Sequence, residues 1–196
     1  RNSDSVPAAS SSSWQSARLL VTDEFAAPPV ILRVGDSVIG TLGNFSASTG
    51  KAKSKKTFNV CAIVAAAMTG GTVLNYSASL PPRKRRILYV DTEQSRFHCK
   101  RVLCRILRLA GLPTDAHPPL LEFLCLRGYA TKERLRKIEE AIYDLDNLGL
   151  VVIDGIRDLA HDINSPGEAT DLITKLMQWT DERRIHIHTV LHLNKG

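Results

Sequence analysis

Short apolar segments alternate with amphipathic segments through the second half of this chain, and this alternation limits the fold more than any other feature. The apolar segments read as strands at Ile87–Val90, Leu121–Leu126, Leu150–Ile153 and Ile185–Leu193. The segments between them read as helices over residues 95–110, 131–147 and 167–182. Strands that alternate with helices predict a parallel sheet covered on both faces, which is an α/β three-layer sandwich. The strand Leu150–Ile153 is apolar throughout and is therefore expected at the centre of the sheet.

The periodicity of the three helices also predicts which side chains face the core. In the helix over residues 95–110, the apolar side chains at helical spacing are Cys99, Val102, Leu103, Ile106, Leu107 and Ala110. The opposite face carries Arg96, Lys100, Arg101, Arg105 and Arg108. A solvated face is the ordinary reading of these cations, with contact to nucleic acid or another subunit as the alternative. The inward residues of the second helix are Leu135, Ile138, Ile142 and Leu145. The inward residues of the third are Leu172, Ile173, Leu176 and Met177.

The first 29 residues differ in composition from the rest. Residues 1–13 are polar and rich in serine, which predicts a disordered segment or an arm. Residues 14–29 read as a connecting segment that ends at Pro28-Pro29. Residues 30–196 are expected to form one domain, which opens with a hairpin of Val30–Val34 and the strand that starts at Val38. Because the chain starts at Arg1 rather than Met, the natural start is expected further upstream.

Composition restricts the class of protein. The chain has 196 residues, enough for one domain with a substantial core, and a net charge of +6 that favours acidic partners such as nucleotides or nucleic acid. The sequence contains neither a signal peptide nor an apolar run near the ~20 residues that span a bilayer. Four cysteines at spacings that suit no zinc site read as buried, reduced thiols of a cytoplasmic protein. These residues are Cys61, Cys99, Cys104 and Cys125.

A basic, glycine-bearing stretch carries the main functional hypothesis. Residues 49–57 read Thr-Gly-Lys-Ala-Lys-Ser-Lys-Lys-Thr and lie between a predicted strand, Val38–Phe45, and a predicted buried helix, Phe58–Met68. This layout is typical of a P-loop, in which backbone N–H groups and the helix N-terminus hold phosphate oxygens. The predicted phosphate-binding residues are Gly50, Lys51, Ala52, Lys53, Ser54, Lys55, Lys56 and Thr57.

The register of the motif follows from its last two residues. With Gly50 as the first glycine, Lys56 would reach the outer phosphates and the Thr57 hydroxyl would bind magnesium. The alternative register, with Gly50-Lys51 as the Gly-Lys pair, places Ala52 at the magnesium position and is rejected. In the accepted register Lys55 replaces the second glycine of the consensus. We expect an extra cation beside the phosphates there, and a loop that closes only with ligand. A solvated lysine-rich loop or a nucleic-acid contact is the competing interpretation.

Two carboxylates follow apolar strands and complete the predicted site. Asp154 ends the strand Leu150–Ile153, which is the position of a magnesium-binding Walker B aspartate. The residue after it is Gly155, so the acid that activates water is expected elsewhere, and Glu93 lies just past the strand Ile87–Val90. Ligands of parallel sheets gather at the carboxyl ends of the strands, which predicts that Asp154 approaches the P-loop. A capping aspartate and a surface glutamate are the structural alternatives.

These motifs together resemble the RecA-type ATPases. The order is a P-loop, Asp91-Thr92-Glu93-Gln94 after a strand, Val-Val-Ile-Asp-Gly at 151–155, and Leu-His-Leu-Asn-Lys-Gly at 191–196. The pattern is most similar to the RepA-like branch of hexameric helicases, in the group with DnaB and KaiC. The resemblance implies a RecA-like fold, ATP and Mg²⁺ as ligands, Glu93 and Lys56 as catalytic residues, and Thr57 and Asp154 as metal ligands. It also implies that His192 or Asn194 senses the γ-phosphate.

The resemblance implies a function and partners as well. The leading hypothesis is the motor domain of a DNA helicase in replication or in the maintenance of mobile elements, working as a homo-oligomeric ring of hexameric type on single-stranded DNA. Such a ring takes an arginine finger from the neighbouring subunit, and the RecA-like domain is expected to continue beyond Gly196. A nucleotide-dependent regulatory or assembly module with little turnover is the alternative. A nucleotide kinase is a third reading, disfavoured because no arginine-rich lid follows the P-loop helix.

Overall fold

The computed structural model describes residues 13–51, 56–160 and 165–193. The described helices are η1 (Ser13–Ala17), α1 (Lys56–Thr69), η2 (Pro82–Lys84), α2 (Arg96–Leu109), α3 (Thr131–Asp144), η3 (Ile156–Leu159) and α4 (Pro166–Arg183). The described strands are β1 (Val30–Val34), β2 (Ser37–Thr41), β3 (Phe45–Lys51), β4 (Thr72–Val73), β5 (Tyr76–Ala78), β6 (Arg86–Asp91), β7 (Leu121–Cys125), β8 (Leu148–Asp154) and β9 (His186–Leu193).

Five of these strands form a parallel sheet in the order β3-β9-β8-β6-β7. The prediction of a mostly parallel central sheet is confirmed, and all seven residues of β8 are buried, as expected of a central strand. The helix after β6 leads to β7 on one side, whereas the helix after β8 leads to β9 on the other. The carboxyl ends of β6 and β8 therefore meet at a topological switch point, where open α/β sheets bind ligands.

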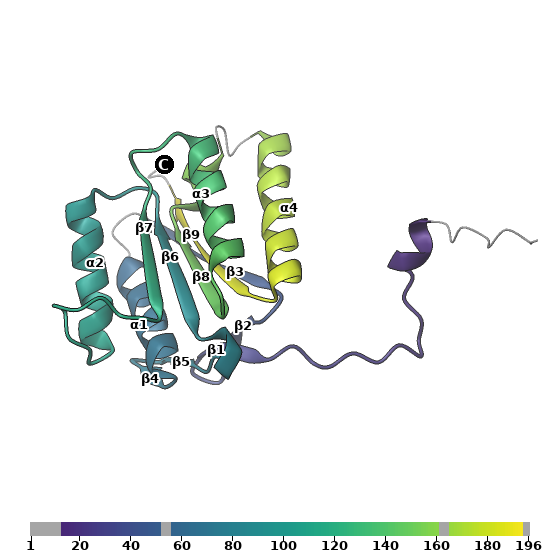
Figure 1. The fold of residues 1–196 in the computed structure, drawn as a ribbon, viewed down its shortest axis with the longest axis horizontal. Helices are drawn as coiled ribbons and strands as arrows, with labels where there is room; N and C mark the ends of the chain where they lie inside the picture. The colour runs from purple at the N-terminus through teal and green to yellow at the C-terminus, as the bar shows by residue number, and fades with distance from the viewer. Residues whose placement is uncertain (1–12, 52–55, 161–164, 194–196) are drawn as a thin grey trace, which may run out of the picture.

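Helices cover both faces of this sheet (Figure 1). Alternate strand residues explain why: Tyr89 and Val152 join the core under α1 and α2, whereas Leu88 and Val151 join the core under α3 and α4. Each of the two apolar clusters is continuous, and Trp179 of α4 is completely buried in the second. The protein therefore has a RecA-like three-layer α/β fold, as the sequence predicts.

The strand that leads into the basic loop differs from the prediction. The hairpin of β1 and β2 is confirmed, but β2 ends at Thr41 and belongs to a separate antiparallel sheet, in the order β2-β1-β5-β4. The chain turns at Gly43, where φ is +82°, and β3 then enters the parallel sheet beside β9. The prediction of one strand over Val38–Phe45 is wrong because this turn divides it. Gly50 and Lys51, predicted in the loop, pair with β9 as part of β3.

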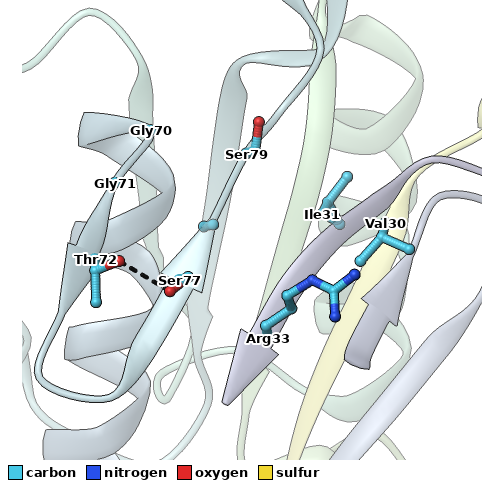
Figure 2. A pocket seen from close by; sticks show the side chains of 9 residues that line it. Val30, Ile31, Arg33, Gly70, Gly71, Thr72, Ser77 and Ser79 are labelled. Carbon is cyan, nitrogen blue, oxygen red and sulfur yellow. Dashed lines mark hydrogen bonds between the residues drawn. The ribbon is translucent and has the colours of Figure 1, made fainter. Parts of the chain in front are cut away.

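The small sheet packs against α1, and an open cavity of about 210 Å³ lies where the sheet meets the C-terminal end of this helix. Figure 2 shows Val30, Ile31 and Arg33 of β1 on one side of the cavity, and the hydrogen bond between Thr72 and Ser77 on the other. Gly70 and Gly71, which follow α1, also line it. The segment between α1 and β6 contains β4, β5 and η2. This cavity is separated from Lys56 by the length of α1, ~20 Å at 1.5 Å per residue.

The helix predictions are confirmed in number and approximate position, with errors at their ends and on one face. Helix α1 starts at Lys56, two residues before the predicted start at Phe58. Helix α3 ends at Asp144 rather than at residue 147. Ile173 and Met177 of α4, predicted to face the core, are 44% and 58% exposed. The face of α4 that packs on the core is rotated from the predicted one, so that Trp179 and Thr180 are buried in place of Ile173 and Met177. None of the helices in the described part of the chain has the length and apolar character needed to cross a bilayer.

Candidate functional site

The N-terminus of α1 holds a buried lysine beside the end of β3. Lys56 is the first residue of α1, is only 8% exposed, and donates a hydrogen bond from its ammonium group to the carbonyl oxygen of Gly50. Gly50 in turn pairs with His192 of β9. The ammonium group is therefore fixed at the carboxyl edge of the sheet, where a helix N-terminus adds a favourable field for anions.

Asp154 ends β8 at the same edge and is almost fully buried, with 3% of its surface exposed. Its carboxylate accepts hydrogen bonds from the Tyr89 hydroxyl and, at the other oxygen, from Nε2 of His192, both at 2.9 Å. Tyr89 lies on β6 and His192 on β9, the two strands that flank β8. Residues of three neighbouring strands thus hold one carboxylate in a fixed position.

Glu93 lies just beyond β6, and its backbone is fixed by Asp91. The carboxylate of Asp91 accepts hydrogen bonds from the backbone N–H of Glu93 at 3.0 Å and of Gln94 at 2.7 Å, and from the Gln94 side chain at 2.7 Å. The side chain of Glu93 is 42% exposed, and its carboxylate lies 3.8 Å from Nε2 of His192. Asp91 therefore fixes the backbone of Glu93. The partly exposed carboxylate of Glu93 lies close to His192, the same histidine that contacts Asp154.

A second set of hydrogen bonds joins the ends of β6 and β8. The hydroxyl of Thr92 contacts the carbonyl oxygens of Asp154 and Gly155 and the carboxylate of Asp158, at 2.8 to 3.2 Å. Gly155 has a φ of +98°, and a Cβ atom built there would lie 2.2 Å from the Thr92 hydroxyl oxygen. The glycine after Asp154 is thus required by both backbone conformation and close packing.

The environment changes the pKa values of Glu93 and His192 in the same direction. Burial is the largest influence on Glu93 and raises the pKa of its carboxyl group, with the nearby carboxylates of Asp158, Asp154 and Asp91 adding to the rise and His192 opposing it. The hydrogen bond to Asp154 is the largest influence on His192 and raises its pKa, while burial and the charge of Lys56 lower it.

The structure brings together most of the residues that the sequence selects. Gly50, Lys56, Asp154, Glu93 and His192 lie at one edge of the sheet, linked by the contacts above, and Thr57 follows Lys56 in the first turn of α1. The backbone of Lys51 pairs with Leu193. The remaining predicted site residues lie outside the described residues. They are Ala52, Lys53, Ser54, Lys55 and Asn194.

Sequence reasoning missed four residues that shape this site. Tyr89 and Asp91 hold Asp154 and Glu93, Thr92 joins the two strand ends, and the guanidinium group of Arg157 contacts the carbonyl oxygen of His192 at 3.5 Å. Tyr89 carried a signal, since it is the one hydroxyl within an otherwise apolar predicted strand. The roles of the others depend on strand order, which the sequence does not contain.

Below the site, a buried chain of hydrogen bonds joins β3 to β9. Ser46 contacts both His186 and His188 at 2.8 Å, Ser48 contacts His188 at 2.9 Å, and Nδ1 of His186 lies 2.9 Å from the carbonyl oxygen of Thr41. Because a carbonyl only accepts, Nδ1 of His186 must donate. With both imidazoles neutral, the hydroxyl of each serine then donates to Nε2 of one histidine. Burial lowers the pKa of His188 to about 4, which keeps it neutral near pH 7.

Comparison with known families agrees with this geometry. A family model described as an AAA domain matches residues 15–196, which is nearly the whole chain. A search of curated proteins gives no match. The family is of the P-loop NTPase type, in the group related to RecA and the helicases, and this indicates a nucleotide-binding ATPase domain. Because the match covers far more than half of its length, the chain belongs to the AAA domain family.

Proposed function

We propose that this ATPase domain is the motor of a RepA-like DNA helicase, which couples ATP hydrolysis to movement on, or remodelling of, single-stranded DNA. The observation that carries the proposal is the meeting of Lys56, Asp154 and Glu93 at one edge of the sheet, with His192 between the two carboxylates. A phosphate-binding cation, a metal-binding carboxylate and a water-orienting carboxylate are the groups that hydrolysis of a triphosphate requires.

The residues fit the proposed ligands by their chemistry. The hydroxyl of Thr57 and the carboxylate of Asp154 are hard oxygen donors, and Mg²⁺ is usually held by one or two such groups together with phosphate oxygens. When bound, Mg²⁺ would neutralise charge on the phosphates. Lys56 would bind the outer phosphates directly.

Glu93 is assigned the water-orienting role. Its carboxylate is held by the Asp91 network at the backbone yet is partly open to solvent, so a water molecule can reach it. The raised pKa of its carboxyl group increases its affinity for a proton, which favours a general base. His192 touches both Asp154 and Glu93, and therefore would transmit a change at either carboxylate to the end of β9.

DNA as a partner is supported by the distribution of charge. Helix α2 carries five basic residues and no acidic residue, and none of the five forms an ion pair with another described residue. Four of them, Arg96, Lys100, Arg101 and Arg108, are exposed, and exposed cations attract a phosphate backbone in a salt-dependent way. A homo-oligomeric ring completes the proposal, with a neighbouring subunit supplying an arginine to each site.

A second function is favoured by one residue of the sequence. Lys55 stands where a P-loop normally has glycine, and slow turnover would follow if its side chain hinders the closure of the loop. The domain would then act as a nucleotide-dependent assembly module, in which binding rather than hydrolysis drives the change of state.

Steady-state ATPase assays with and without single-stranded DNA separate these functions. A motor predicts turnover that DNA stimulates, with the affinity for DNA falling as salt rises. Nucleotide binding with little turnover and no stimulation by DNA would favour the assembly module. Transfer of the γ-phosphate to a small acceptor would instead reveal a kinase and contradict both.

A further inference from the structure

An open cavity of about 580 Å³ lies at the carboxyl edge of the parallel sheet, between the start of α2 and the loop that joins β7 to α3. We call this cavity the β7 pocket. Gln94, Ser95 and Arg96 line one side of it, and Cys125 and residues 127–129 line the other. A cavity of this volume is large enough to hold a small organic group such as a nucleotide.

The β7 pocket is positively charged and contains an aromatic ring. Arg96 and Arg127 come from its two sides, both are exposed, and neither forms an ion pair with another described residue. Within the described part of the chain, no acidic side chain lines the pocket. Tyr129 adds a ring that is 38% exposed, and the ammonium group of Lys137 lies 4.5 Å from the centroid of that ring. Cations around an exposed ring are the groups that hold the phosphates and bases of a single nucleic-acid strand.

The loop that carries Arg127 and Tyr129 is held in shape by Arg134 of α3. The guanidinium group of Arg134 donates to the carbonyl oxygens of Leu126 at 3.1 Å, Tyr129 at 2.8 Å and Arg127 at 3.0 Å. Its Nη1 also donates to the carbonyl oxygen of Asp158 in η3, at 3.1 Å. Because these contacts already fix the loop, a ligand does not have to order it, which lowers the entropic cost of binding.

The β7 pocket is close to Glu93 but distant from Lys56. Gln94, which lines the pocket, donates from its backbone and its side chain to Asp91, whose carboxylate also fixes the backbone of Glu93. Lys56 follows β3, whereas the pocket borders β6 and β7. In the strand order β3-β9-β8-β6-β7, four steps of ~4.8 Å place β3 and β7 ~19 Å apart. A ligand in the pocket would therefore lie beside the network that holds Glu93 and outside the predicted phosphate site.

We propose that the β7 pocket holds a short segment of single-stranded DNA, with Arg96 and Arg127 on backbone phosphates and a base stacked on Tyr129. Two arginines from different elements match a ligand that carries successive negative charges. The exposed ring suits an unpaired base, whose face is open, rather than a duplex. This inference rests on the DNA part of the proposed function, to which it assigns a site, and it does not depend on ATP hydrolysis.

The first test measures the affinity for a fluorescent oligothymidine by anisotropy, over a range of salt concentrations and without ATP. Arg96→Gln/Arg127→Gln should lose about 10-fold or more in affinity. The slope of log affinity against log salt should become shallower by about 1.4, the value for two phosphate contacts on a single strand. Arg83→Gln/Arg85→Gln is the matched control, because it removes the same charge from two exposed arginines at the amino edge of the sheet. The control should keep the wild-type slope, and equal effects of the two double variants would overturn the proposal.

The second test concerns the base. Tyr129→Leu should lower the affinity for the oligothymidine about 5-fold or more and leave the salt slope unchanged, because it removes a stacking surface and no charge. An oligonucleotide that contains 5-iodouracil should crosslink to Tyr129 on irradiation. Tyr143, which is 40% exposed in the last turn of α3, is the control and should not be labelled. Unchanged affinity in Tyr129→Leu, or crosslinks confined to other residues, would overturn the proposal.

The same data separate failure of this inference from failure of the proposed function. A wild type that binds the oligothymidine as tightly as Arg96→Gln/Arg127→Gln does would overturn the β7 pocket as the site and leave DNA as a partner. A wild type that binds no single-stranded DNA would overturn both. Displacement of the oligothymidine by ATP, with a matching loss of ATP affinity in the pocket variant, would show that the pocket belongs to the nucleotide site and would also overturn the inference.

Discussion

At the scale of single residues, the two carboxylates of the site differ in what holds them. Asp154 is buried between a tyrosine and a histidine, whereas Glu93 keeps a partly exposed carboxylate on a fixed backbone. A buried carboxylate that accepts two hydrogen bonds is held in a fixed position, which suits the binding of a metal ion. A fixed but accessible carboxylate suits contact with water. This difference agrees with the separate roles proposed for the two acids, metal binding by Asp154 and orientation of water by Glu93.

Replacing Glu93 with Gln tests this separation. The amide keeps the size of the side chain but cannot accept a proton, so turnover should fall by roughly 100- to 1,000-fold while the affinity for nucleotide changes little. Single-turnover hydrolysis and equilibrium binding, measured on the same variant, check both parts. Normal hydrolysis by this variant would show that another group orients the water.

Replacing Gly155 with Ala tests the packing beside Asp154. The φ of +98° and the 2.2 Å approach of a Cβ atom to the Thr92 hydroxyl both oppose any side chain. We expect a loss of about 2 kcal/mol or more in the free energy of unfolding. Gly128→Ala is the matched control, because a Cβ atom there meets nothing within 4 Å and its φ is not in the left-handed region. Equal denaturation midpoints for the two variants would refute the packing argument.

The contact between His192 and Asp154 predicts a measurable titration. The carboxylate favours the imidazolium, so the pKa of His192 lies above its ordinary value of 6.5. The contribution of this pair to the free energy of unfolding is fully present below pH 6.5 and is lost as the pH rises through the raised pKa of His192. NMR titration of the imidazole should show the raised pKa in the wild type and a decrease in Asp154→Asn. An unchanged pKa in the variant would mean that the two side chains do not interact.

At the scale of elements, β3 is held in the sheet by polar contacts. Among the described strands it pairs with β9 alone. Its residues Ser46 and Ser48 are hydrogen-bonded to His186 and His188 rather than packed as an apolar face. This chain fixes the register of β3 against β9, and β3 carries Gly50 to the site. The same feature explains why the sequence did not reveal β3: alternating serines give a weak strand signal.

Acid should loosen this attachment. The pKa of His188 is lowered to about 4 in the folded state, so between pH 6.5 and 4 the unfolded chain binds the extra proton and the folded chain does not. The free energy of unfolding should therefore fall over this range, by up to about 3 kcal/mol from His188 alone. Denaturant titrations at pH 7 and pH 4.5 measure the fall. In His188→Asn this pH dependence should shrink, and a variant with the same dependence as the wild type would contradict the assignment.

The elements that the sequence predicted well are those with strong apolar periodicity. The strands β6 to β9 and helices α2 to α4 follow from it, with end positions in error by a few residues. The two halves of the P-loop strand could not be separated because the turn at Gly43 depends on a positive φ within an apolar run. In α4, apolar spacing overestimated the buried face, because burial of Trp179 depends on how the helix sits on the sheet.

At the scale of the whole molecule, strand order decides the site. Asp154, Glu93 and His192 are far apart in sequence and meet because β6, β8 and β9 are neighbours. The position after an apolar strand was sufficient to select Asp154 and Glu93, since parallel strands end at one edge. His192 was selected only through the family resemblance. The partners that orient them, Tyr89 and Asp91, required the neighbouring strands to be known. Candidate ligands were thus predictable from the sequence, whereas the network that holds them was not.

In the proposed function, Lys56 and Asp154 hold a magnesium–nucleotide complex at this edge. Isothermal titration calorimetry with ATP and Mg²⁺ tests it most directly, on the wild type, on Lys56→Ala, and on Lys100→Ala as a control cation exposed on α2. We expect wild type and Lys100→Ala to bind one nucleotide with the same affinity, and Lys56→Ala to lose at least 10-fold in affinity. No detectable binding by the wild type at millimolar nucleotide, or equal affinities for all three proteins, would contradict the account.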